Sequence, residues 1–218
     1  MRENVINAVL KEKLIVIVRG VEKDKLIPLA QAMYDGGVRL LELTYDSTGK
    51  TEDSQTAQNI QVLKEHFKDK MYIGAGTVTT QEQVEYTKKA GGEFIISPDI
   101  NAQVIKKTRM LDMVSMPGAL TPTEIMTAHV NGADFVKLFP AVSMGSEYIK
   151  AVKAPLSHIK LLAVGGINES NMQEYLNAGV CGFGVGSNIV DKKLLDEENY
   201  SAITKLAEKY VSVVKGTK

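Results

Sequence analysis

The chain of 218 residues lacks several features that would place it in other classes of protein. It contains one cysteine, Cys181, so no disulfide can form within the chain and a reducing compartment is expected. No stretch approaches the roughly 18 apolar residues that a membrane span needs. The N-terminus carries acidic residues and no apolar run of the signal-peptide type. We therefore expect a cytoplasmic protein with no membrane partner.

An excess of charge of one sign is also missing, because 26 lysines and arginines balance 26 aspartates and glutamates. A nucleic-acid partner or an anionic membrane surface would favour a basic excess, so neither is expected. Any anionic ligand must then be bound by local geometry. The three histidines, His66, His129 and His158, lie far apart in the sequence with no ligand partner at metal spacing. We predict no metal site.

What the sequence does contain is a repeated alternation of strand and helix patterns. A short amphipathic helix ends near Lys13, and the continuous β-branched run L-I-V-I-V follows, as is typical of a strand buried on both faces. Eight strands are predicted, at residues 14–18, 38–44, 71–75, 93–97, 112–116, 134–138, 160–164 and 181–185. Helices are predicted between and after them, at residues 24–34, 56–67, 81–90, 102–109, 122–131, 146–152, 170–178 and 202–214.

Eight strands that alternate with helices favour a single (β/α)8 TIM barrel with an N-terminal helix, forming one domain over residues 1–218. A Rossmann-type sheet is the alternative. It is disfavoured because the repeat reaches eight units. In addition, neither G-A-G-T-V-T at Gly74 nor G-F-G-V-G-S at Gly182 completes the G-x-G-x-x-G motif of that fold.

One lysine stands in the middle of an apolar strand, A-D-F-V-K-L-F-P at residues 133–140. Alternation places Phe135, Lys137 and Phe139 on one face of the strand, so the amine shares its face with two aromatic rings. Burial disfavours the charged amine and lowers its pKa, which turns a lysine into a nucleophile toward a carbonyl carbon. The alternative is a lysine at a strand end whose amine reaches water. The strand alone favours neither interpretation.

Other polar residues lie near the C-terminal ends of predicted strands, where TIM barrels have their active sites. Arg19 follows the first strand, and Thr77 and Pro98 end the third and fourth strands, where we expect them to line the pocket. Alternation directs Glu42 of the second strand into the barrel, where its pKa should rise, so that it can transfer protons near neutral pH. The alternative is a buried ion pair of Glu42 with Lys137 or Arg19 that only holds the core. Because buried ion pairs contribute little to stability, we favour a functional role.

Glycines follow the seventh and eighth predicted strands, as Gly165-Gly166 and as Gly184-Val185-Gly186-Ser187. The loops after these two strands are where TIM barrels bind phosphate, through backbone amides and a helix N-terminus. Two tight turns without a ligand are the alternative. We favour phosphate, because glycines occur in both expected loops.

These residues belong to a longer set of motifs that covers nearly the whole chain. The motifs are I-V-R-G at 17–20, G-G-V-R-L-L-E-L-T at 36–44, G-A-G-T-V at 74–78, I-S-P at 96–98, M-P-G-A-L-T-P-T-E at 116–124, F-V-K-L-F-P-A at 135–141, G-G-I-N at 165–168 and G-V-G-S at 184–187. Together they resemble the pyruvate-dependent class I aldolases that cleave 2-keto-3-deoxy-6-phosphogluconate (KDPG) and 4-hydroxy-2-oxoglutarate (KHG).

The resemblance implies a role for each matching residue. It makes Lys137 the Schiff-base lysine and Glu42 the acid/base, and it implies that Arg19 and Thr77 hold the substrate while Phe139 packs on the pyruvate methyl group. The backbone groups implied to hold the phosphate are those of Gly165, Gly166, Gly186 and Ser187. The family is further expected to be homotrimeric and free of cofactor. Its small-molecule partners are pyruvate and either glyceraldehyde 3-phosphate or glyoxylate.

Two positions depart from the family pattern. Asp46 stands where many members have an arginine that helps to bind the keto-acid carboxylate, and Val164 replaces the threonine of a P-T-G-G turn. With S-M-G-S-E-Y-I-K-A at 143–151, both resemble sister enzymes that act on 2-keto-3-deoxy-6-phosphogalactonate. We expect an aldolase for the phosphogluconate or for hydroxyoxoglutarate, with the phosphogalactonate as an alternative. A phosphate-binding isomerase or epimerase, which would not need Lys137, and a ligand-binding homologue without activity are also open.

Overall fold

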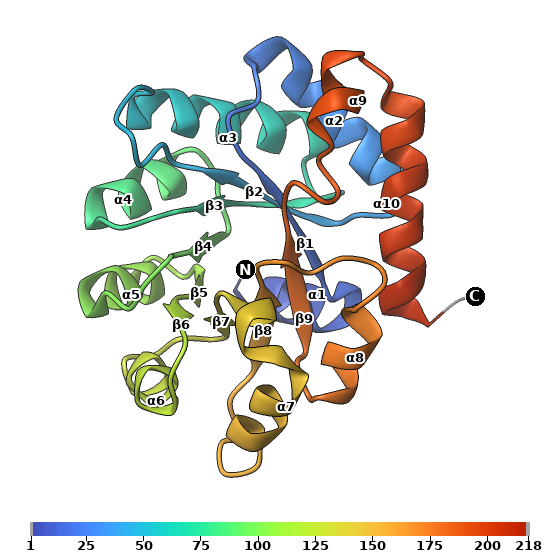
Figure 1. The fold of residues 1–218 in the computed structure, drawn as a ribbon. Coiled ribbons are helices and arrows are strands. Elements are labelled where there is room, and N and C mark those ends of the chain that lie inside the picture. Colours follow the sequence, from blue (N-terminus) through green and yellow to red (C-terminus); the bar gives the residue numbers. More distant parts are fainter. Residues whose placement is uncertain (1, 217–218) are drawn as a thin grey trace.

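The structure, a computed structural model, describes residues 2–216 and has the predicted (β/α)8 barrel architecture (Figure 1). Its strands are β1 (Leu14–Val18), β2 (Leu40–Thr44), β3 (Tyr72–Gly76), β4 (Phe94–Ile96), β5 (Val114–Met116), β6 (Gly118–Ala119), β7 (Val136–Leu138), β8 (Leu161–Val164) and β9 (Gly182–Val185). Its helices are α1 (Arg2–Glu12), α2 (Lys23–Asp35), α3 (Asp53–Phe67), α4 (Gln81–Lys89), α5 (Ala102–Met110), α6 (Pro122–Val130), α7 (Ala141–Lys153), α8 (Met172–Asn177), α9 (Lys192–Asp196) and α10 (Tyr200–Lys215). Parallel pairing gives the sheet order β5-β4-β3-β2-β1-β9-β8-β7-β6.

The barrel closes through β5 and β6, which are two halves of one strand on either side of Pro117. The first half pairs with β4 and the second with β7. Proline interrupts the strand because it has no N–H to donate to a neighbour. Its carbonyl still accepts the amide of Lys137 at 2.9 Å, and the Ser115 carbonyl accepts the amide of Asp134 at 2.9 Å. The nine strands of the sheet therefore correspond to the eight strands that the sequence predicts.

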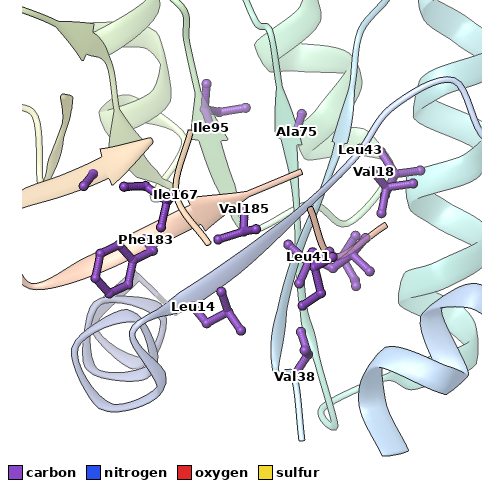
Figure 2. Packing of buried hydrophobic residues seen from close by; sticks show 14 of the residues in the cluster. Leu14, Val18, Val38, Leu41, Leu43, Ala75, Ile95, Ile167, Phe183 and Val185 are labelled. Atoms are coloured by element: carbon purple, nitrogen blue, oxygen red, sulfur yellow. The ribbon is translucent and has the colours of Figure 1, made fainter. Parts of the chain in front are cut away.

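Side chains alternate between the inside of the barrel and its outer face. Outward-facing residues such as Leu41, Ala75 and Phe183 belong to the large apolar cluster between strands and helices (Figure 2). The interior cluster combines Ile15, Leu40, Phe94, Val114 and Leu162 of the strands, and Phe135 directly before β7, with Val5 and Val9 of α1. Helix α1 thus closes the N-terminal end of the barrel, and the C-terminal end is left for a site.

The predicted element boundaries need small corrections. Helix α7 begins at Ala141, five residues before its predicted start, because Gly145 with φ +77° joins two helical stretches across a kink. That kink breaks the apolar period on which the predicted start depends. Helix α9, at five residues, is too short to give a periodic pattern and is absent from the predicted elements. None of the helices within residues 2–216 is long and apolar enough to span a membrane.

Candidate active site

Lys137 and Glu42 line one small cavity inside the barrel, Lys137 from β7 and Glu42 from β2. The rest of its wall is apolar and consists of Ile15, Ile17, Ile96, Leu162, Val164 and Gly184. Each of the two groups also affects the pKa of the other through its charge. The fold therefore brings together the two residues that the sequence predicts as nucleophile and acid/base.

The Glu42 carboxyl group is buried without a full set of partners. The residue is 2% exposed, and its Oε2 atom has no hydrogen-bond partner among the described residues. Burial raises its pKa to about 7, although the positive charges of Lys137 and Arg19 oppose the shift. Such a carboxyl group can both donate and accept a proton at neutral pH.

Space for this carboxyl group depends on Gly76, which sequence reasoning did not single out. A Cβ atom at Gly76 would lie 2.4 Å from Glu42 Oε1, a distance at which atoms collide. The second glycine of the G-A-G-T-V motif could have been recognised, because alternation places it on the same inner face as the glutamate. A glycine is needed at this position because the Glu42 side chain lies so close to the backbone of β3.

The Lys137 amine lines the same cavity as this buried carboxyl group. Burial lowers its pKa, Glu42 opposes that shift, and the positive charge of Arg19 adds to it. Nζ is 5.0 Å from the ring centroid of Phe139, which is 43% exposed and so reaches solvent at the mouth. A lowered pKa increases the fraction of neutral amine, the form that attacks a carbonyl carbon.

Arg19 and Thr77 are joined across the mouth of the barrel. Arg19 Nη2 donates to Thr77 Oγ1 at 3.1 Å, linking the residue after β1 to the residue after β3. Thr77 has φ +58°, an uncommon conformation for a β-branched residue. Because a guanidinium has five N–H donors, Arg19 can hold this bond and still bind an anionic group.

Pro98 also ends its strand at this mouth, where it is exposed. Its carbonyl oxygen lies against Gly118, where a Cβ atom would come within 2.3 Å. The residue lies beside the start of β6 and is not among the described residues that line the cavity of Lys137 and Glu42. Its place at the rim agrees with the prediction, but its contact with a substrate stays a prediction.

The two glycine loops lie at the same end of the barrel as the cavity. Gly165 and Gly166 have φ of +95° and +77°. A Cβ atom at Gly165 would lie 3.1 Å from the ring of Phe139, so this loop packs against the end of β7. Within residues 2–216, the amides of Gly166, Gly186 and Ser187 donate to no acceptor. Free amides in glycine loops are the groups that bind phosphate without lysine or arginine.

Asp46 organises its own loop at the rim. Its carboxylate accepts hydrogen bonds from the amide and hydroxyl of Thr48 at 2.8 and 2.7 Å, and from the amides of Lys50 and Thr51 at 3.0 and 2.9 Å. The bonds from Thr48 contribute most to lowering its pKa to about 2. With Arg19, this loop lines a cleft of about 430 Å³ between the ends of β1 and β2. The sequence shows the missing arginine at this position, and the structure adds the hydrogen bonds by which the aspartate holds its loop.

Comparison with known proteins agrees with this geometry. Residues 5–206 match the model of the family described as KDPG and KHG aldolase. The chain is 37% identical over 180 residues to a 2-dehydro-3-deoxy-6-phosphogalactonate aldolase of Escherichia coli K12, covering 82% of this chain and 85% of the relative. It is 30% identical over 217 residues to a 2-dehydro-3-deoxy-phosphogluconate aldolase of Haemophilus influenzae, covering 98% of each.

Two solved structures are similar over most of the chain. A KDPG aldolase from Legionella pneumophila, with pyruvate captured as a covalent carbinolamine intermediate, has a TM-score of 0.83 and 30% identity, covering 93% of this chain and 96% of that one. A cube-shaped protein cage designed by fusing symmetric oligomeric domains has a TM-score of 0.85 and 32% identity, covering 95% of this chain and 73% of that one.

Proposed function

Because this chain belongs to the KDPG and KHG aldolase family and is a carbon–carbon lyase, we propose that Lys137 and Glu42 perform class I aldol cleavage of a 2-keto-3-deoxy-6-phospho sugar acid. The observation that carries the proposal is the pair itself. A lysine with a lowered pKa and a glutamate with a pKa of about 7 share one apolar cavity. Imine formation needs a neutral amine beside a group that can move protons, and this cavity supplies both.

In the first stage, the Lys137 amine attacks the C2 carbonyl carbon of the substrate, forming a C–N bond. The amine proton passes to the former carbonyl oxygen to give a carbinolamine. Protonated Glu42 then donates a proton to this hydroxyl group, which leaves as water, and an iminium ion remains. Glu42 is now a carboxylate, the form needed for the next step.

In the second stage, the Glu42 carboxylate takes the proton of the C4 hydroxyl group. The C3–C4 bond breaks, its electron pair moves into the iminium to form an enamine, and the aldehyde leaves as glyceraldehyde 3-phosphate. Glu42 returns the proton to C3 of the enamine and is again a carboxylate. Water then adds to C2 of the resulting iminium, the C–N bond breaks to give pyruvate and neutral Lys137, and the proton that this hydrolysis releases passes to Glu42. Each proton that Glu42 gives is regained, so a pKa of about 7 suits both directions of transfer.

The residues around the mouth would hold the rest of the substrate. Arg19, fixed by Thr77, has N–H donors left for carboxylate or phosphate oxygens, and its charge adds to the lowering of the Lys137 pKa. The ring of Phe139, next to the amine, would pack on the methyl group of pyruvate, and Pro98 would line the rim. The free amides of the two glycine loops would bind the phosphate, through Gly165, Gly166, Gly186 and Ser187.

A second candidate substrate is 2-keto-3-deoxy-6-phosphogalactonate. Two observations favour it over the phosphogluconate: the higher identity to a phosphogalactonate aldolase, 37% against 30%, and the use of Asp46 by its own loop in place of an arginine at the mouth. The two sugar acids differ in the configuration of a hydroxyl group, so the shape of the rim decides between them. Pyruvate release from phosphogluconate, phosphogalactonate and hydroxyoxoglutarate, compared as kcat/KM, distinguishes these substrates.

We also propose that the protein is a homotrimer in the cytoplasm. The trimer is supported by the family resemblance and by the similarity to a cage built from symmetric oligomeric domains. The single cysteine fits a reducing compartment. Native mass spectrometry should give three times the chain mass of 23.8 kDa, and a monomer at micromolar concentration would contradict the proposal.

Trapping with pyruvate and borohydride tests the mechanism directly. The reductant converts an imine into a stable amine, so peptide mapping should find one pyruvyl group, at Lys137. Lys153 is the matched control, because burial also lowers its pKa but its amine donates to the carbonyls of Ser157 and Ile159 outside the cavity. Lys153→Met should be labelled like the unaltered protein and Lys137→Met should not. An adduct on another lysine, or none, would refute this mechanism.

A further inference from the structure

The loops after β8 and β9 are tied together by the side chain of Asn188. Its Nδ2 atom donates to the carbonyl of Ile167 at 2.8 Å, which links the two glycine loops directly. The carbonyl of Asn188 in turn accepts a hydrogen bond from the hydroxyl of Tyr210 at 3.2 Å. Tyr210 belongs to α10 and is 1% exposed, so a fixed phenol holds the link from outside the barrel.

A second asparagine acts on the preceding peptide group of the same loop. Asn171 Nδ2 donates to the carbonyl of Gly166 at 3.1 Å, and its Oδ1 accepts the amide of Asn168 at 2.9 Å. The carbonyls of Gly166 and Ile167 are therefore both bound by asparagine side chains. Because a trans peptide is planar, with its N–H opposite its C=O, fixing the Gly166 carbonyl also fixes the amide of Ile167. The bond from Asn188 to the Ile167 carbonyl fixes the next peptide, whose Asn168 amide donates to Asn171, so its main effect is to hold the two loops together.

Other backbone amides of these two loops are not used in hydrogen bonds within the described residues. Among the described residues, those of Gly166, Ile167 and Ser187 donate to no acceptor. Glu169, the nearest acidic residue in the loop sequence, has its charge paired by Lys209 at 2.5 Å. Glu169 also interacts with the hydroxyl of Tyr210. The loops thus present unused N–H donors, which are the groups that bind a phosphate monoester without lysine or arginine.

We propose that Asn171 and Asn188, with Tyr210 acting through Asn188, are positioning residues for the phosphate group of the substrate: Asn171 fixes the Ile167 amide, and Asn188 holds the loop after β9 against the loop after β8. The inference rests on the proposed function, which assigns phosphate to these loops. It adds that the affinity for phosphate depends on neutral amide side chains that do not touch the ligand. None of the three residues contributes to the chemistry at Lys137.

The test compares a phosphorylated with a non-phosphorylated substrate. Condensation of pyruvate with glyceraldehyde 3-phosphate and with glyceraldehyde is measured for Asn188→Ala, Asn171→Ala and Tyr210→Phe. The matched control is Asn177→Ala, which removes an exposed amide at the end of α8 that accepts a bond from Gln173 outside the loops. Loss of a positioning hydrogen bond should raise KM for glyceraldehyde 3-phosphate about tenfold in Asn188→Ala and Asn171→Ala and about threefold in Tyr210→Phe. The KM for glyceraldehyde and the rate of pyruvate trapping should not change.

A purely structural role gives a different pattern. If the variants lose activity equally with both aldehydes, or if Asn177→Ala behaves like Asn188→Ala, the positioning proposal is overturned. Tyr210→Phe removes one oxygen atom and keeps the ring, so it gives an answer even if an asparagine variant does not fold.

Failure of the aldolase mechanism would be recognised separately. In that case the unaltered protein forms no pyruvate adduct, and calorimetric binding of glycerol 3-phosphate still tests the loops. Weaker binding by Asn188→Ala than by Asn177→Ala would then support the positioning role, and equal binding would end it.

Discussion

The two ends of the barrel both contain buried acidic side chains, but only one end pairs them. At the N-terminal end, the Asp134 side chain is 5% exposed and accepts bonds from Arg2 at 2.5 Å, from Arg109 at 2.7 Å and from the amide of Ser115 at 3.0 Å. At the C-terminal end, Glu42 is 2% exposed, and one of its oxygens has no partner among the described residues. Burial is common to both ends, and the missing partner distinguishes the functional one.

Glu93 repeats the N-terminal pattern before β4. Its carboxylate accepts bonds from Lys64 at 2.8 Å and from the amide of Ile73 at 3.2 Å. A paired carboxylate ties segments together, so its removal should cost stability. An unpaired one is held at a cost to the fold but stays ready to exchange a proton. Substitutions should therefore change activity at one end of the barrel and stability at the other.

The largest effect is expected for Lys137→Met. Removing the nucleophile should lower kcat by at least about 10,000-fold, as is typical when a covalent catalyst is lost. The unfolding free energy should stay the same or rise, because an amine whose pKa burial lowers is replaced by an apolar side chain of similar length. Steady-state kinetics measures the loss of kcat, and urea unfolding measures the unfolding free energy. Retained cleavage activity would show that Lys137 is not the nucleophile.

Glu42→Gln should lower kcat by about 100- to 10,000-fold, the usual contribution of general acid–base catalysis. The pH profile of kcat/KM should lose an ionisation near pH 7, because the pKa of Glu42 is raised to about 7. A profile that keeps this ionisation in the variant would assign the proton transfer to another group.

Glu42→Gln should also change how the unfolding free energy depends on pH. The folded protein holds the Glu42 proton up to about pH 7, whereas the unfolded chain releases it near the ordinary glutamate pKa of 4.5. Unfolding free energy should therefore fall as pH rises from 4.5 to 7, by roughly 3 kcal/mol at most. Glu42→Gln should remove this slope and be more stable than the unaltered protein at pH 8, but not at pH 4. Urea unfolding at both pH values measures the difference.

Asp134→Ala tests the opposite end of the barrel. It leaves Arg2, Arg109 and the amide of Ser115 without their shared acceptor. Breaking a buried pair in this way should cost about 3 to 5 kcal/mol of unfolding free energy. In the fraction that stays folded, kcat should change less than twofold, since the residue lies at the far end of the barrel from Lys137. A loss of kcat with unchanged stability would remove the contrast between the two ends.

How much of the fold and the site could be predicted depends on whether the feature is local in the sequence. Alternation within one strand was enough to direct Glu42 and Lys137 inward, and the strand–helix repeat was enough to predict the barrel. The space for Glu42 comes from Gly76 on the neighbouring strand, which depends on strand register and is not visible within either strand alone. The link from Tyr210 to Asn188 joins the loop after β9 to a helix near the end of the chain, which no local pattern indicates.

Asp46 gives the smallest predicted effect, because it acts on the shape of the rim and not on the reacting atoms. Asp46→Asn keeps one oxygen acceptor and loses the other, so the amides of Lys50 and Thr51 lose their acceptor. We expect KM to rise about two- to fivefold with kcat nearly unchanged, since hydrogen bonds at an exposed loop each contribute little. The pKa of Asp46 is lowered to about 2, so its contribution to the loop is present above the ordinary value of 3.8 and is lost only as pH falls through about 2. The effect of the substitution should therefore be the same at pH 6 and pH 8, unlike that of Glu42→Gln. A KM that varied with pH in this range for Asp46→Asn alone would contradict this expectation. It would show that the loop held by Asp46 is coupled to the titration of Glu42 and Lys137.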